Sequence, residues 1–167
     1  MKIGICPGSF DPVTMGHLDI ISRSRKIFDH VIVAVMINPA KKTLFTVEER
    51  IDLLKRATAD MENVEVVGFA GLLAEYARQR GATAVVKGLR AVTDFEYEFQ
   101  QALTNKKLNP DMETLFMTTN SEHMFLSSSI VKQIAMFGGD ISNFVPECIL
   151  EDVKKRICED QLLIGQK

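Results

Sequence analysis

Short apolar runs along this chain alternate with longer segments in which apolar residues recur at every third or fourth position. Residues 31–37 (VIVAVMI) are continuously apolar and rich in β-branched side chains, a pattern typical of a strand buried on both faces of a parallel sheet. Similar short runs at residues 2–6, 64–67, 83–87 and 114–118 predict four further strands.

The segments between these runs have the spacing of amphipathic helices. A capping-box pattern at residues 46–49 (TVEE) marks one helix start. In a later segment, Phe95, Phe99 and Leu103 share one helical face. The predicted helices cover residues 17–28, 47–59, 71–80, 94–108 and 127–137, and Pro146 begins a last helix.

Strand and helix alternate five times, which predicts an α/β fold: a five-stranded parallel sheet with helices on both faces. No linker, internal repeat or low-complexity tract interrupts the chain. We therefore expect residues 1–167 to form a single domain, with the final residues LLIGQK loosely held.

Composition excludes several classes of protein. The formal net charge of −2 argues against a nucleic-acid-binding surface, because such surfaces carry an excess of basic residues. No apolar run approaches the roughly 18 residues of a membrane span, and the N-terminal run is too short for a signal peptide. We expect a cytoplasmic protein without a membrane or nucleic-acid partner, in which Cys6, Cys148 and Cys158 are buried free thiols.

The segments that follow the predicted strands contain most of the candidate chemistry. Ligands of an open α/β sheet bind beyond the carboxyl ends of its strands. Four of these ends lead into PGSFDPVTMGH (7–17), NPAKK (38–42), KGLR (87–90) and TTNSEHMFLSSSIVK (118–132), whereas the third strand leads into the apolar GFAGLL (68–73). The four polar segments contain groups suited to binding an anion.

Two predicted helix starts at this edge are suited to phosphate. A helix N-terminus presents unpaired N–H groups and partial positive charge, and it binds anions readily. Gly16 lets a phosphate approach the backbone before His17, whose cationic form the helix dipole disfavours. Ser127, Ser128 and Ser129 add hydroxyl donors at the second helix start. Two such sites in one crevice would hold a chain of phosphates.

Each of these motifs taken alone has a structural explanation. Gly16-His17 fits an ordinary turn, the serines fit an N-cap, and Lys41 with Lys42 fits a solvated loop. Their joint placement on one sheet edge favours a binding site. The sequence lacks a G-x-S-x-G elbow, a P-loop and a G-x-G-x-x-G first turn, which argues against a serine hydrolase, a P-loop kinase and an ordinary NAD site.

Two motifs identify a resemblance to a known family. TMGH (14–17) fits the first signature of the nucleotidyltransferase superfamily, and LSSSIVK (126–132) resembles its second. Together with PGSFDP, NPAKK, KGLRAVTDFEYE and the chain length, they make nearly the whole sequence similar to the bacterial phosphopantetheine adenylyltransferases. The resemblance implies a Rossmann-like subunit that transfers the adenylyl group of ATP to 4′-phosphopantetheine with Mg²⁺, releasing pyrophosphate and dephospho-coenzyme A. It also implies a homohexamer and feedback inhibition by coenzyme A.

The same resemblance implies roles for individual residues. His17 and Lys41 would be catalytic, and Mg²⁺ would arrive with ATP rather than occupy a metal site of the protein. The residues that would bind phosphopantetheine are Ser9, Lys41, Leu73 and Lys87. The residues that would bind ATP are Ser9, Phe10, His17, Gly88, Leu89, Arg90, Glu98, His123, Met124, Phe125, Leu126, Ser127, Ser128 and Ser129.

Three positions depart from the family pattern. Ser9 stands where threonine is common, which preserves the hydroxyl group. Lys87 stands where arginine is common, and this keeps the charge but loses the bidentate fork. His123 stands where tyrosine or tryptophan is common.

Two other functions stay open at this point. One is a different nucleotidyltransferase of the same superfamily, with nicotinate mononucleotide or glycerol phosphate as acceptor. The other is a non-catalytic module that binds a nucleotide without turning it over. KGLRAVTDFEYE and GFAGLL favour the pantetheine acceptor, and the intact set of polar residues favours catalysis.

Overall fold

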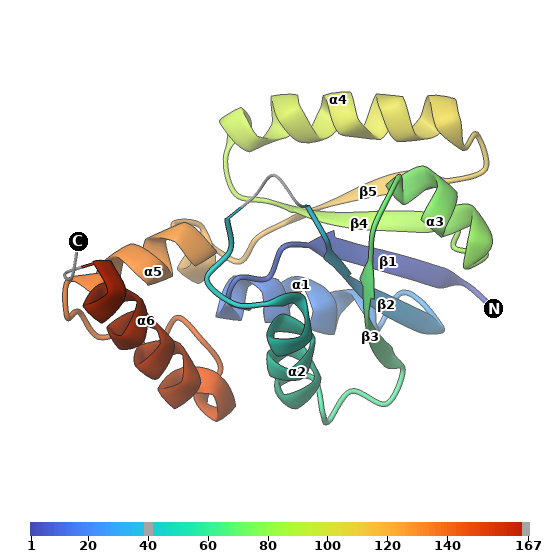
Figure 1. The fold of residues 1–167 in the computed structure, drawn as a ribbon. Coiled ribbons are helices and arrows are strands. Elements are labelled where there is room, and N and C mark those ends of the chain that lie inside the picture. Colours follow the sequence, from blue (N-terminus) through green and yellow to red (C-terminus); the bar gives the residue numbers. More distant parts are fainter. Residues whose placement is uncertain (39–41, 165–167) are drawn as a thin grey trace.

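Five parallel strands form one sheet in the order β3-β2-β1-β4-β5 (Figure 1). The structure, a computed structural model, describes residues 1–38 and 42–164. The strands are β1 (Ile3–Gly8), β2 (His30–Met36), β3 (Val64–Phe69), β4 (Ala84–Leu89) and β5 (Glu113–Thr118). The predicted five-stranded parallel sheet is therefore confirmed.

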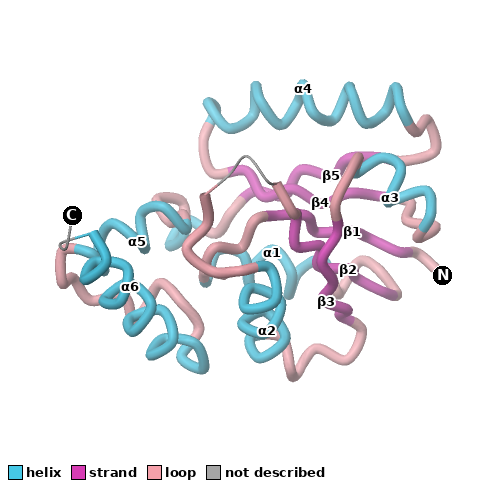
Figure 2. The backbone as a smooth tube through the Cα atoms, in the orientation of Figure 1, coloured by secondary structure: helices cyan, strands magenta, loops and turns pink. Residues whose placement is uncertain are grey.

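Helices cover both faces of the sheet, as predicted. They are α1 (Met15–Ser24), α2 (Val47–Ala57), α3 (Leu73–Gln79), α4 (Val92–Leu108), α5 (Ser128–Met136) and α6 (Leu150–Ile164), with 3₁₀ turns η1 (Ser121–His123) and η2 (Glu147–Ile149). α1 and α2 lie on one face, and α3 and α4 lie on the other (Figure 1). α5 and α6 lie beyond the sheet, on the side of the carboxyl ends of the strands (Figure 2). None of the described helices is long and apolar enough to cross a membrane.

The central strands bury both of their faces. In β2, Val31, Val33 and Val35 pack into the core cluster that also contains the buried residues of α1, α2, α5 and α6. Ile32 and Ala34 pack into the opposite cluster, beneath α3. Successive side chains of a strand point to opposite faces, so a continuously apolar strand is needed to fill both layers.

Some element boundaries differ from the predicted ones for local reasons. α1 begins at Met15 rather than at His17, because Thr14 is its N-cap and the Thr14 hydroxyl oxygen accepts the His17 backbone N–H at 3.3 Å. β1 continues through Pro7 and Gly8, because both residues stay in register with β2. The β1–α1 connection is therefore shorter and more tightly held than the sequence suggests.

The apolar face of α4 is exposed. Phe95, Phe99 and Leu103 are 41%, 44% and 56% exposed, and no described side chain of residues 94–108 is buried. Phe95 also meets Phe116 of the edge strand β5 edge-to-face, with ring centroids 5.7 Å apart. α4 and β5 therefore form an open apolar side of the subunit.

The prediction of three buried thiols is wrong for two of them. Cys6 is buried in β1, and burial raises the pKa of its thiol to about 11. Cys148 and Cys158 are exposed. α6 buries Val153 and Ile157, and a helix turns by roughly 100° per residue, so the residue after Ile157 faces solvent.

Candidate functional site

A cleft of about 400 Å³ lies at the carboxyl ends of β1 and β4. The order of strands reverses here, since β1 has β2 on one side and β4 on the other. Connections from two such strands leave toward opposite faces of the sheet, which opens a crevice between them. The β1–α1 loop, the end of β4 and the start of α5 line this crevice.

Most residues predicted for the site line this cleft. They are Ser9, Phe10, His17, Lys87, Gly88, Arg90, Glu98, Leu126, Ser127, Ser128 and Ser129. They come from segments far apart in the sequence, and the parallel sheet brings those segments to one edge. Residues of both signature motifs, TMGH and LSSSIVK, therefore line the same cleft.

Other predicted residues are not in the lining. They are Leu73, Leu89, His123, Met124 and Phe125. Leu73 begins α3 and packs against the core beneath that helix. His123 lies next to Gly16, with its Cβ 3.6 Å from where a Cβ on Gly16 would stand. Lys41 lies outside the described residues, as do the last three residues of the chain, and their predicted roles stay predictions.

His17 is held in place by the start of its own helix. The Thr14 backbone N–H donates to His17 Nδ1 at 3.0 Å, and Thr14 Oγ1 lies 3.1 Å from the same nitrogen. The ring also meets Phe10 edge-to-face, with centroids 5.0 Å apart. Because Nδ1 accepts the backbone hydrogen bond, a neutral ring carries its proton on Nε2. Nε2–H is then the donor that His17 offers to a ligand.

The surroundings of His17 keep it neutral. Burial, followed by the charges of Arg90 and Lys87, lowers its pKa from 6.5 to about 4. The helix-dipole argument therefore predicted the direction correctly, but burial and the two neighbouring cations are the causes in the structure. A neutral donor with two cations nearby suits a phosphate oxygen.

Each described cation of the cleft has a carboxylate partner. Lys87 Nζ lies 3.1 Å from Glu98 Oε2. Arg90 Nε lies 3.3 Å from Asp94 Oδ2, while its Nη1 donates to the Leu126 carbonyl at 2.9 Å. These pairs hold the cations in defined positions before any ligand binds.

The serine-led start of α5 forms the opposite wall. Ser127 is the N-cap, and its hydroxyl oxygen accepts the Ile130 N–H at 3.1 Å. The Ser128 hydroxyl donates to the Pro12 carbonyl at 2.8 Å, which ties α5 to the β1–α1 loop. The remaining N–H groups of the first turn, with the partial positive charge of the helix, give this wall the character of an anion site.

The β1–α1 loop contains a strained residue beside these groups. Phe10 has φ = 47°, an uncommon conformation for a bulky residue. Its ring lies against Gly8, where a Cβ would stand 3.0 Å from the ring. The buried Arg50 of α2 donates from Nη1 to the Ser9 carbonyl at 2.7 Å. Packing on Gly8 and the Arg50 hydrogen bond therefore hold the loop in this shape.

Sequence reasoning missed four residues that shape the cleft from within or behind: Asp11, Thr14, Arg50 and Lys132. Asp11, Thr14 and Lys132 stand inside the quoted motifs, so polar residues there were a usable signal. Arg50 gave no such signal, because an arginine on an amphipathic helix is normally exposed.

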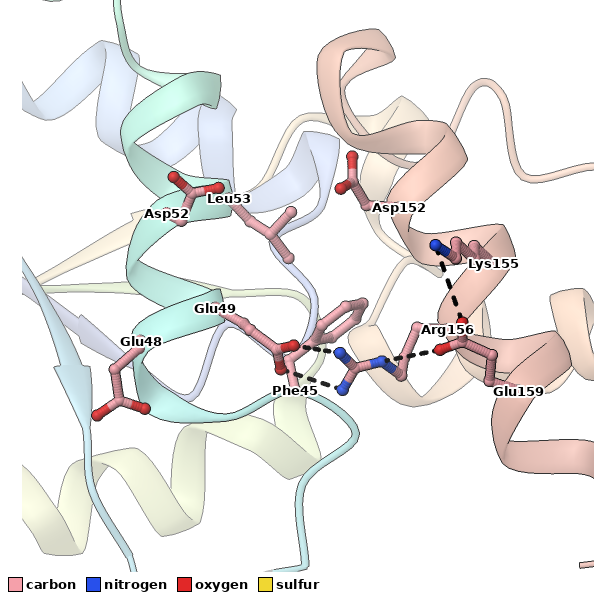
Figure 3. A pocket seen from close by; sticks show the side chains of 9 residues that line it. All are labelled: Phe45, Glu48, Glu49, Asp52, Leu53, Asp152, Lys155, Arg156 and Glu159. Carbon is pink, nitrogen blue, oxygen red and sulfur yellow. Dashed lines mark hydrogen bonds and ion pairs between the residues drawn. The ribbon is translucent and has the colours of Figure 1, made fainter. Parts of the chain in front are cut away.

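A second hollow of about 400 Å³ lies between α2 and α6 (Figure 3). Its polar lining is mostly acidic, with Glu48, Glu49 and Asp52 on the α2 side. Arg156 pairs with Glu49 in two hydrogen bonds and lies 5.1 Å from the centroid of the Phe45 ring. The excess of carboxylates makes this hollow unsuited to phosphates, so the cleft at β1 and β4 is the candidate site.

Comparisons with known proteins agree with this placement. A family model described as cytidylyltransferase-like matches residues 5–134. A phosphopantetheine adenylyltransferase from Caldanaerobacter subterraneus subsp. tengcongensis is 57% identical over 156 residues, which are 93% of this chain and 98% of the relative. One from Clostridium tetani is 55% identical, again over 93% of this chain and 98% of the relative.

A solved structure shows the same fold at much lower identity. The crystal structure of a bifunctional NMN adenylyltransferase/ADP ribose pyrophosphatase from Francisella tularensis matches 98% of this chain with a TM-score of 0.69 and 14% identity. The matched part is 54% of that longer chain. The likeness supports the Rossmann-like arrangement of sheet and helices.

Proposed function

We propose that this chain, which belongs to the phosphopantetheine adenylyltransferase family, transfers the adenylyl group of ATP to 4′-phosphopantetheine. The products are dephospho-coenzyme A and pyrophosphate. The observation that carries this function is the cleft, where a neutral His17, two cations and a serine-led helix start converge in a chain that matches named relatives over nearly its full length.

The reaction needs positioning and charge stabilisation more than acid–base catalysis. An oxygen of the acceptor phosphate attacks the α-phosphorus of ATP, and the bond from that phosphorus to the β-phosphate oxygen breaks. The attacking group is already an anion, so no proton has to be removed. The main barrier is the approach of two anions, which fixed donors and cations lower.

The cleft residues divide this task. The Nε2–H of His17 would donate to a non-bridging oxygen of the α-phosphate as charge builds there. Lys87 would orient the acceptor phosphate, with Lys41 as its predicted partner. Arg90 and the first turn of α5 would hold the departing pyrophosphate. The presence of His17, Lys87, Arg90 and the serines of α5 in the cleft lining supports these roles, whereas the role of Lys41 rests on the family resemblance alone.

Mg²⁺ is proposed to bind with ATP. The described residues contain no group of three or more His, Cys, Asp or Glu side chains able to hold a metal ion. Oxygen donors suit Mg²⁺, which usually binds through one or two carboxylates plus substrate phosphates. The triphosphate would therefore bring the ion into the cleft, and the ion would neutralise phosphate charge.

The direct test is pyrophosphate release from Mg-ATP, with 4′-phosphopantetheine, nicotinate mononucleotide or glycerol phosphate as the acceptor. We expect release only with 4′-phosphopantetheine. Release with another acceptor alone would keep the fold and the role of His17 but overturn the pantetheine assignment. ATP binding without release in any mixture would identify a nucleotide-binding module.

Three finer properties stay proposals. The exposed apolar face of α4 supports self-association, with the homohexamer as the proposed assembly. Coenzyme A is the proposed feedback inhibitor, because it contains the adenylylated phosphopantetheine that the cleft produces. A cytoplasmic location is proposed because ATP is the co-substrate. Mass measurement in solution tests the assembly, and inhibition of pyrophosphate release by coenzyme A tests the second property.

A further inference from the structure

An ion pair inside the cleft links three segments that the mechanism needs at fixed separations. We propose that Asp11 and Lys132 are a positioning pair, which holds the β2–α2 segment against the start of α5 without touching substrate. The proposal rests on the function proposed above, because that function requires cations after β2 and phosphate donors on α5 to act on one reaction.

Asp11 is committed to three donors. Its Oδ1 accepts the Phe45 backbone N–H at 2.9 Å, and its Oδ2 accepts the Leu44 backbone N–H at 2.9 Å. The same Oδ2 lies 2.9 Å from Lys132 Nζ on α5. One carboxylate therefore joins the β1–α1 loop, the β2–α2 segment and α5.

Burial makes this pair different from the other ion pairs of the cleft. The side chain of Asp11 is 3% exposed and that of Lys132 is 27% exposed. By contrast, Lys87 and Glu98 are 24% and 20% exposed. Lys132 is as accessible as Lys87, so the difference lies in the carboxylate. A phosphate that takes Lys87 leaves a partly solvated Glu98, whereas one that takes Lys132 would leave the buried Asp11 carboxylate without a counter-ion, which is costly.

A second contact fixes the helix side of the link. Ser128 and Lys132 are one helical turn apart on α5, and both reach the β1–α1 loop, Ser128 at the Pro12 carbonyl and Lys132 at Asp11. α5 therefore stays attached through Ser128 and through the buried Val131 when Lys132 is removed. In the β2–α2 segment, Arg156 of α6 holds the Leu44 carbonyl, but Asp11 is the only acceptor that the structure describes for the backbone N–H groups of Leu44 and Phe45.

This arrangement predicts which of the two substrates shows a raised KM. If Lys132 positions Asp11, its loss disturbs the β2–α2 segment and raises KM for 4′-phosphopantetheine. If Lys132 instead binds the triphosphate, its loss raises KM for ATP. The two roles also differ in how the effects of the substitutions combine. If the pair acts by positioning, removing either partner already abolishes its effect, so removing both costs no more than removing one.

The kinetic test compares Lys132→Met, Asp11→Asn and the double variant in the full-length protein. We expect each single variant to lower kcat/KM about 10- to 100-fold, as small misplacements in active sites do, mainly through KM for 4′-phosphopantetheine. The kcat/KM of the double variant should be no lower than that of the less active single variant. Lys154→Met, which removes an exposed lysine paired with Glu151 on α6, is the matched control and should behave as the wild type.

A second measurement does not depend on activity. Amide hydrogen exchange at Leu44 and Phe45 should become at least about 10-fold faster in Lys132→Met, because loosely held N–H groups exchange through local opening. Exchange within α6 should stay unchanged, which shows that the fold is intact.

Three results would overturn the proposal: a loss in Lys132→Met that falls mainly on KM for ATP, multiplying losses in the double variant, or unchanged exchange at both amides in Lys132→Met. A wild-type protein that releases no pyrophosphate with any acceptor would instead refute the proposed function, and the exchange result would then decide the positioning role alone.

Discussion

His17 illustrates how much one side chain depends on its surroundings. Its pKa is lowered from 6.5 to about 4 by burial and by two neighbouring cations, and its Nδ1 is occupied by the Thr14 backbone N–H. Protonation state and tautomer are both settled before a ligand arrives. A phosphate oxygen therefore meets an oriented N–H donor whose charge does not change near neutral pH.

Replacing His17 tests this role directly. His17→Ala should lower kcat by about 10²- to 10³-fold, the usual loss on removing one preorganised donor to a transition-state oxyanion. His30→Ala is the matched control. His30 is not in the cleft lining, and its Nε2 lies 3.0 Å from Glu65 Oε2. Pyrophosphate release measures the effect, and near-normal turnover in His17→Ala would remove His17 from the mechanism.

The lowered pKa of His17 also makes stability depend on pH. Between pH 6.5 and about 4 the unfolded chain binds a proton at this residue that the folded chain does not, so acidification through this window favours unfolding. We expect His17→Gln to lose less stability than the wild type between pH 7 and pH 5. Urea unfolding at both pH values measures this, and parallel losses in the two proteins would contradict it.

The contribution of the sequence to the site can be judged residue by residue. Placing His17, Lys87 and the three serines at one sheet edge required only the strand–helix alternation and the rule for parallel sheets. The Asp11–Lys132 pair could not be predicted, because the two residues are 121 positions apart and no periodicity relates them. Such a contact depends on how α5 packs, which local patterns do not encode.

At the scale of elements, α6 supports the cleft from behind. Arg156 donates to the Leu44 carbonyl at 3.1 Å. It also pairs with Glu49, and its guanidinium lies over the Phe45 ring (Figure 3). These contacts tie α6 to the segment that Asp11 holds from the other side. The hollow of Figure 3 is thus a junction between α2, α6 and the β2–α2 segment.

Removing the contacts of Arg156 should lower the stability of the fold measurably. Arg156→Met should reduce the free energy of unfolding by about 1 kcal/mol, since partly exposed ion pairs and cation–π contacts each contribute up to about that much. Lys155→Met is the matched control, because its side chain is 79% exposed and meets Glu159 only at 4.0 Å. Urea unfolding at pH 7 compares the two, and equal stability of both variants would contradict the role of Arg156.

Element boundaries show where sequence patterns lose precision. The continuous apolar run of β2 predicted its strand almost residue for residue, because burial on both faces leaves little choice. The start of α1 was misplaced by two residues, because a histidine rather than a glutamate completes the capping box with Thr14. The sequence predicted the face shared by Phe95, Phe99 and Leu103 on α4, yet it did not indicate that this face stays exposed in the subunit.

At the scale of the whole molecule, the exposed face of α4 predicts assembly. Phe99→Glu with Leu103→Glu should shift the protein to smaller species in sedimentation analysis, because buried charges without partners weaken an apolar interface. Gln101→Glu adds a charge on another side of α4 and should leave the assembly intact. Wild-type protein that sediments as a monomer, or an unchanged size in the double variant, would contradict this use of the face.

The pairing of Lys87, Arg90 and Lys132 with carboxylates bears on what the cleft admits in a crowded solution. Because each of these three cations already has a carboxylate neighbour, we expect the cleft to bind a single orthophosphate or sulfate ion only weakly. A single small anion gains too few contacts to displace Glu98 or Asp94 from its cation. A triphosphate and a phosphorylated acceptor offer many more oxygens for contact, so we expect the same carboxylates to favour these substrates over small anions.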